Sequence, residues 1–109
     1  KAANPLGEWS VGPAFIGSLA QLGTVRYSKL AEVIADVLVG DPARLAALEQ
    51  HELRTGEGGN APIRVREDGA VCYRVYLQQK SPSARRLHYW RRGNWVELSR
   101  VVLHDDVAP

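Results

Sequence analysis

The sequence predicts a small α+β domain, in which about three N-terminal helices pack on a C-terminal four-stranded antiparallel sheet. Apolar residues recur at helical intervals over about residues 10–54, and they alternate with polar residues over about residues 61–104. A loop at residues 55–60, which contains three glycines, separates the two patterns. A chain of 109 residues is long enough for one core without disulfides, so we expect 1–109 to be a single domain.

Three helices account for the N-terminal half. The first is expected over residues 13–23, between a proline and a glycine. Ser28 caps the second, whose apolar residues repeat at the i, i+3, i+4, i+7 interval up to residue 38. Asp41 and Pro42 begin the third, because aspartate caps a helix and proline suits its first position, and this helix is expected to reach about residue 53.

The first hairpin is predicted to join residues 63–66 to residues 71–78. Its loop, residues 67–69, ends in a glycine that can take the left-handed conformation. This loop length pairs Val65 with Val71 and Ile63 with Tyr73, which keeps the apolar side chains on one face.

The second hairpin is predicted to join residues 86–92 to residues 95–103 through a two-residue turn at Gly93-Asn94. That register places three pairs opposite one another: Trp90 and Glu97, His88 and Ser99, and Tyr89 and Leu98.

Polar side chains gather on one face of this sheet, which is expected to be open. Successive residues of a strand point to opposite faces, so one face is apolar and the other carries cations, an imidazole and a carboxylate. These residues are Arg64, Arg66, Arg74, Tyr76, Arg86, His88, Trp90, Glu97 and Ser99.

Such a set suits metal-independent cleavage of RNA, which needs a base, an acid and cations that hold the phosphate. Glu97 is the expected base and His88 the expected acid, because diagonal neighbours on adjacent strands lie within roughly 7–8 Å. Arg64, Arg66, Arg74 and Arg86 would bind phosphate, Ser99 would assist in substrate binding, and Trp90 and Tyr76 would stack on bases.

Residues 61–104 resemble the barnase and RelE-type family of small microbial ribonucleases, many of which are toxins. The strand Cys72-Tyr73-Arg74-Val75-Tyr76-Leu77 and the hairpin after it are similar to the central strands of RelE-like chains. The resemblance implies Glu97 as base, Arg74 and Arg86 as phosphate ligands, and His88 or His104 as acid. It also implies an RNA substrate such as tRNA or mRNA, no metal or other cofactor, a neutralising antitoxin or immunity protein, and action in the cytoplasm.

The charge distribution agrees with a polyanionic partner for the C-terminal half. Residues 1–60 hold five cations and seven carboxylates, whereas residues 61–109 hold nine and five, within a net charge of +2. No apolar run reaches the roughly 20 residues of a membrane span, so no membrane partner is expected. A single cysteine excludes an internal disulfide. The lack of methionine suggests a processed chain or a fragment of a longer, secreted protein.

Two other functions fit parts of the pattern. Residues 30–38 and 42–53 suit a helix-turn-helix with a hairpin as wing, although the second helix has few cations. Alternatively, Trp90, Tyr76 and the arginines suit a protein-interaction surface. Glu97 between Arg91 and Arg100 also fits a simple surface ion pair. His51-Glu52 is half of a zinc-protease motif, and no metal role is expected for it.

Overall fold

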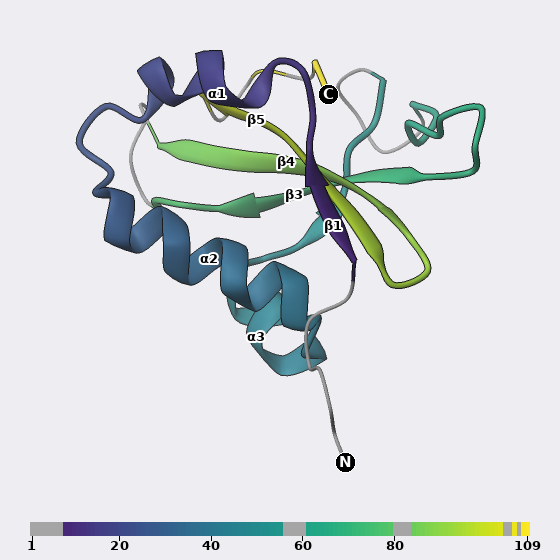
Figure 1. The fold of residues 1–109 in the computed structure, drawn as a ribbon, viewed down its shortest axis with the longest axis horizontal. Helices are drawn as coiled ribbons and strands as arrows, with labels where there is room; N and C mark the ends of the chain where they lie inside the picture. The colour runs from purple at the N-terminus through teal and green to yellow at the C-terminus, as the bar shows by residue number, and fades with distance from the viewer. Residues whose placement is uncertain (1–7, 56–60, 80–83, 104–105, 107) are drawn as a thin grey trace.

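A five-stranded mixed sheet is covered on one face by helices in the computed structural model of the chain (Figure 1). The structure describes residues 8–55, 61–79, 84–103, 106 and 108–109. In chain order the elements are β1 (Trp9–Val11), α1 (Phe15–Ser18), the 3-10 helix η1 (Leu19–Gln21), α2 (Tyr27–Val39), α3 (Pro42–Ala47), β2 (His51–Glu52), β3 (Val71–Tyr76), β4 (Arg85–Arg92) and β5 (Trp95–Leu103). The α+β class is therefore confirmed.

The sheet has the order β1-β5-β4-β3-β2. Strands β3, β4 and β5 form an antiparallel meander as predicted, but the predicted strand at residues 63–66 makes only isolated bridges. The fourth antiparallel strand is instead β2, from residues predicted as helix, and β1 adds an edge strand parallel to β5. The sequence analysis missed β1 because three residues are too few to establish an alternating pattern.

The main core lies between the helices and the sheet. Leu30, Val33 and Val37 of α2 pack against Leu87 and Tyr89 of β4, and all five side chains are buried. This confirms the amphipathic pattern that predicted α2. Gly40 ends that helix with a φ of 74°, a left-handed conformation that glycine adopts without steric cost.

The third helix is shorter than predicted. Asp41 caps it by accepting a hydrogen bond from the backbone N–H of Arg44 (3.2 Å), but α3 ends at Ala47 instead of near residue 53. Glu49 then adopts a φ of 53°, which turns the chain away from the helix axis and into β2. The propensity of residues 48–53 for a helix is overridden by pairing of β2 with β3.

Registers in the two hairpins are confirmed near their turns and differ farther away. Val65 pairs with Val71 as expected, but Tyr73 pairs with Glu52 of β2 in place of Ile63. In the second hairpin the pairs Trp90–Glu97 and Tyr89–Leu98 are confirmed. A bulge between His88 and Tyr89 leaves Ser99 as the additional residue, so His88 lies opposite Arg100 and the predicted His88–Ser99 pair is wrong.

Candidate functional site

The sheet face that points away from the main core is partly closed. His88 is fully buried and Trp90 is 8% exposed, whereas both were expected on an open surface. A second small core covers part of this face, formed by Leu53, Ala70, Cys72 and Trp90 with Trp95 packed against it. The expectation of an open face is wrong for these residues because strand alternation cannot show which other segments of the chain pack over a sheet.

At one end of this face, four residues form what we call the tryptophan cluster: Arg66, Trp90, Trp95 and Glu97. The Arg66 guanidinium donates to Glu97 Oε1 (3.0 Å) and lies 4.9 Å from the ring centroid of Trp90 and 5.4 Å from that of Trp95. Arg66 also pairs with Asp68 (2.9 Å) and thereby helps to hold the pKa of that carboxyl at about 2. The guanidinium is therefore already neutralised by two carboxylates.

Glu97 is enclosed as well as paired. Its side chain is 17% exposed, and the chain just after β1 passes so close that a Cβ atom on Gly12 would lie 2.9 Å from Glu97 Oε2. Gly12 thus permits the close approach of the chain after β1 to Glu97. This environment suits a structural ion pair better than a base that must reach a substrate hydroxyl.

His88 also has an environment that does not suit a general acid. Its Nδ1 lies 2.7 Å from the carbonyl oxygen of Ala108, so Nδ1 carries the proton, and the buried Nε2 has no hydrogen-bond partner among the described residues. Burial lowers the pKa of His88 to about 4. At neutral pH the ring is therefore neutral, and its Nε2 has no proton to donate to a leaving group.

At the other end of the face, four residues form what we call the arginine cluster: His51, Arg74, Tyr76 and Arg86. Strand pairing brings them together, since His51 of β2 lies opposite Arg74 of β3 and Tyr76 lies opposite Arg86 of β4. Arg74 Nε donates a hydrogen bond to His51 Nε2. The Arg86 guanidinium lies 4.5 Å from the Tyr76 ring centroid and donates through Nη2 to the Tyr76 hydroxyl oxygen (3.1 Å).

The arginine cluster carries positive charge that no carboxylate balances within the described part of the chain. Neither Arg74 nor Arg86 forms an ion pair there, and the buried Nε of Arg86 has no hydrogen-bond partner. Burial lowers the pKa of Arg74, and the adjacent Arg86 lowers it further. Burial is also the main cause that lowers the pKa of His51, and the positive charge of Arg74 lowers it further. An anion placed here would relieve this repulsion.

The predicted site residues thus divide into groups. Arg74, Tyr76 and Arg86 come together, whereas Arg66, Trp90 and Glu97 belong to the tryptophan cluster. The remaining predicted residues lie elsewhere: Arg64 in the segment between β2 and β3, where its backbone bonds to Leu53 and Cys72; Ser99 at the bulge of β5; and His104 outside the described residues.

His51 is the one member of the arginine cluster that sequence reasoning missed. It was expected in the third helix, where nothing would bring it near Arg74. Only the pairing of β2 with β3, a contact between residues far apart in the sequence, places it there. No local signal in the sequence indicated this contact.

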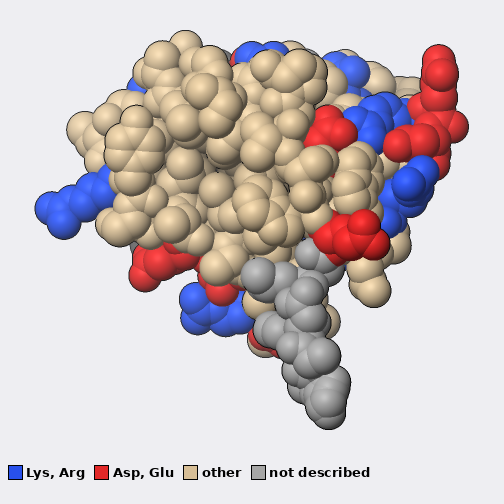
Figure 2. Space-filling model, viewed as in Figure 1, with Lys and Arg blue, Asp and Glu red and all other residues tan. Residues whose placement is uncertain are grey.

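The helix-covered side offers a different surface. Figure 2 shows the face that carries α1, α2 and β1, and most of its visible area has no charged side chain. Large apolar side chains are exposed on these elements, among them Trp9, Ile16 and Tyr27. A protein surface with so few cations binds a polyanion weakly.

Other chemistry has little support among the described residues. No three His, Cys, Asp or Glu side chains there are grouped as metal ligands, and none of the helices there has the length and apolar character to cross a membrane. Cys72 is buried, which raises the pKa of its thiol to about 12. The helix-turn-helix alternative is weakened because α3 has only six residues and its Arg44 pairs with Asp36 (3.1 Å).

No protein-family model matches the chain, and neither the curated proteins nor the solved structures gave a match.

Proposed function

We propose that this domain binds the phosphate backbone of RNA at the arginine cluster and cleaves the RNA without a metal ion. One observation carries the proposal: Arg74 and Arg86 lie together on one sheet face, without a carboxylate partner among the described residues. Guanidinium groups match phosphate oxygens in geometry and charge, and they remain protonated even where a neighbouring cation lowers their pKa. The excess of cations in residues 61–109 supports a polyanion over a small carboxylate ligand.

His51 is the proposed base. Its lowered pKa keeps the imidazole neutral at pH 7, and its Nε2 already acts as a hydrogen-bond acceptor from Arg74. When Arg74 turns to a phosphate, Nε2 becomes available to take the proton of the 2′-hydroxyl. The 2′-oxygen then attacks phosphorus and the bond from phosphorus to the 5′-oxygen breaks, which leaves a 2′,3′-cyclic phosphate and a 5′-hydroxyl.

Tyr76 is the proposed acid. Its hydroxyl oxygen accepts a hydrogen bond from Arg86, so its own proton points elsewhere and can be donated to the leaving 5′-oxygen. Arg86 would then stabilise both the phenolate and the phosphorane-like transition state. His51 and Tyr76 replace Glu97 and His88 in these roles because the latter pair is enclosed. The toxin resemblance adds a neutralising protein as a proposed partner.

Incubation of the purified domain with a tRNA pool and total RNA in EDTA tests the proposal. We expect discrete fragments ending in 2′,3′-cyclic phosphate, which disappear in His51→Ala and Arg74→Gln. Glu52→Ala is the matched control for His51, because Glu52 is the exposed neighbouring residue of β2 and lies outside the cluster.

Binding and cleavage are separated by titration with RNA whose 2′-hydroxyls are methylated, which cannot be cleaved by this route. Arg74→Gln should weaken this binding and reduce its salt dependence, whereas His51→Ala should leave binding nearly unchanged. Binding without cleavage of ordinary RNA would refute the nuclease assignment, and failure of the folded protein to bind would refute the RNA assignment altogether.

A further inference from the structure

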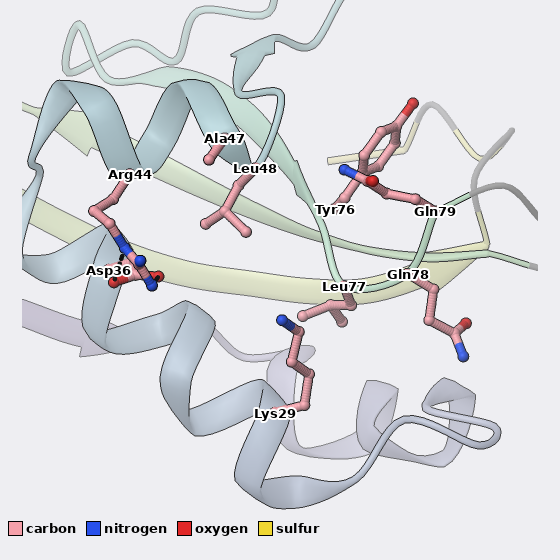
Figure 3. A pocket seen from close by; sticks show the side chains of 9 residues that line it. All are labelled: Lys29, Asp36, Arg44, Ala47, Leu48, Tyr76, Leu77, Gln78 and Gln79. Carbon is pink, nitrogen blue, oxygen red and sulfur yellow. Dashed lines mark hydrogen bonds and ion pairs between the residues drawn. The ribbon is translucent and has the colours of Figure 1, made fainter.

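The arginine cluster is closed on its outer side, at the edge of β3. There β2 pairs with β3, and the backbone N–H of Tyr76 donates to the carbonyl oxygen of Leu48 (3.0 Å). A cavity of about 430 Å³ lies between α2, α3 and the end of β3, and within it Arg44 pairs with Asp36 (3.1 Å; Figure 3). A strand held at the cluster is therefore blocked at this edge, whereas β4 and β5 extend the sheet on the other side.

Across those strands, polar side chains form one row on the face that carries the arginine cluster. His51 pairs with Arg74 and Arg74 with His88, so the row crosses β2, β3 and β4. His88 in turn pairs with Arg100 of β5. Directly paired residues of adjacent strands share a face, and neighbouring strands lie about 4.8 Å apart, so the backbones of Arg74 and Arg100 are roughly 10 Å apart. Arg100 is thus placed to contact a neighbouring phosphate of a strand that is held at Arg74.

His88 lies between the two arginines of this row, and its electrostatic surroundings agree with the strand pairing. Burial is the main cause that lowers the pKa of His88. The hydrogen bond to Ala108 and the charge of Asp106 raise this pKa, whereas the charges of Arg74 and Arg100 lower it. Both guanidinium groups are therefore near the imidazole, and the row forms one continuous cationic surface.

The C-terminal segment occupies this surface at His88 and Arg100. Asp106 Oδ2 accepts a hydrogen bond from Arg100 Nη2 (3.4 Å), and the carbonyl oxygen of Ala108 lies 2.7 Å from His88 Nδ1. Asp106 Oδ1 also accepts from the backbone N–H of Ala108 (2.9 Å), so one carboxylate links the two contacts. Asp106 thus supplies at Arg100 the negative charge that a phosphate would supply.

The pair of Asp106 with Arg100 is weak enough to be replaced. The two side chains are 37% and 31% exposed, and such pairs contribute little because water and salt screen them. While the segment is in place, His88 Nε2 stays buried without a hydrogen-bond partner among the described residues, which opposes the docked arrangement. Arg66, by contrast, is held by two carboxylates, one of them the enclosed Glu97. A phosphate can therefore displace the carboxylate at Arg100 more easily than those at Arg66.

We infer that Arg100 is a second phosphate ligand of the RNA strand, and that bound RNA displaces Asp106 from it. The inference rests on the proposed function, because it takes one phosphate to be held at Arg74 and Arg86. A phosphate offers two oxygens for a bidentate pair with the guanidinium, whereas Asp106 Oδ2 accepts from a single nitrogen. Displacement also uncovers His88, whose Nδ1–H then donates to the strand. The RNA thus crosses the sheet from β3 to β5 along the row.

Binding of an uncleavable 2′-O-methyl oligouridine decamer, measured by fluorescence anisotropy, tests the inference. Asp106→Asn removes the competing charge and should tighten binding about threefold to fivefold, the range of an exposed ion pair. Arg100→Gln should weaken binding and reduce the slope of log K against log salt by about 0.7, the value for one phosphate contact of a single strand. Glu67→Gln and Arg26→Gln are the matched charge controls, because both residues are exposed and lie outside the row.

The double variant of Arg100→Gln with Asp106→Asn separates displacement from a general effect of charge. The gain from Asp106→Asn should vanish once Arg100 is replaced, because the carboxylate then no longer competes for a phosphate ligand. A gain no larger than that of Glu67→Gln would overturn the displacement, and so would a gain that persists without Arg100.

The outcomes also separate the inference from the proposed function. If Arg74→Gln loses binding while Arg100→Gln binds like Arg26→Gln, the phosphate site stands and the second ligand is overturned. If the folded parent protein does not bind the decamer, the proposed function fails and the inference fails with it. Circular dichroism and urea unfolding verify that each variant is folded.

Discussion

Glu97 stabilises the fold in this structure, so Glu97→Gln should lower the free energy of unfolding and leave the proposed RNA binding and cleavage intact. The carboxylate holds Arg66 close to two indole rings, in a part of the sheet face that the arginine cluster does not include. A catalytic base would give the opposite pattern, with activity lost and stability retained. The two roles of Glu97 are therefore distinguishable in one variant.

The magnitude follows from the contacts. A hydrogen bond between charged groups contributes about 1.5–3 kcal/mol, and glutamine keeps one acceptor oxygen, so we expect a loss of about 1 kcal/mol. Arg66→Ala removes the whole pair with Glu97 and also two cation–π contacts of about 0.5–1 kcal/mol each, so its loss should be about 2.5–5 kcal/mol, besides any effect of losing the exposed pair with Asp68. Because the two residues are in contact, the double variant should lose less than the sum of the single losses.

Urea unfolding followed by tryptophan fluorescence measures these losses, since Trp90 is nearly buried in the native state. Glu67→Gln is the matched control, because Glu67 is exposed in the adjacent loop. The structural interpretation is refuted if Glu97→Gln unfolds like the parent protein but no longer cleaves RNA. Additive losses for Arg66 and Glu97 would also contradict the contact that the argument uses.

Three further predictions concern buried polar groups. Because the pKa of His88 falls from 6.5 in the unfolded chain to about 4 in the fold, stability present above pH 6.5 should be lost as the pH falls toward 4. At 1.36 kcal/mol per pH unit the loss is about 3 kcal/mol. Urea titrations from pH 7.5 to 3.5 should show this loss, and His88→Leu should lack most of it. The Cys72 thiol, with its pKa of about 12, should react with a disulfide reagent at least 100-fold more slowly in buffer than in urea; equal rates would show that the second core is open. Tyr89→Phe should cost about 1–2 kcal/mol in urea unfolding, because the buried hydroxyl donates to Gln50 Oε1 (2.7 Å); an unchanged midpoint would mean that water replaces the bond.

The sequence predicted those parts of the fold that local periodicity determines. The spacing of Leu30, Val33 and Val37 identified α2, and the Gly93-Asn94 turn identified the hairpin of β4 and β5 and its first pairs. It failed where long-range contacts decide the structure. Strands β1 and β2 have three and two residues, and each exists only because a longer strand from the C-terminal half lies beside it.

The candidate site was predicted in part for the same reason. Alternation placed Arg74, Tyr76 and Arg86 on one face, and the structure brings these three together. Alternation cannot reveal which segments cover a face, however. It therefore also placed Trp90 and His88 on the open face, although both side chains are buried. The bulge that separates His88 from Ser99 has no signal in the sequence, since it depends on how β5 fits against its neighbours.

Carboxylates distinguish the two clusters of this sheet face. Arg66 faces Asp68 and Glu97, so its charge is compensated within the fold and its ordering stabilises the second core. Arg74 and Arg86 face one another and the neutral imidazole of His51, so folding places like charges together without a carboxylate in the described chain to offset their repulsion. Proteins tolerate such costs mainly at functional sites, where a ligand supplies the missing charge. We therefore expect an anionic substrate to bind at Arg74 and Arg86, whose charges no carboxylate of the described chain compensates, and not at Arg66.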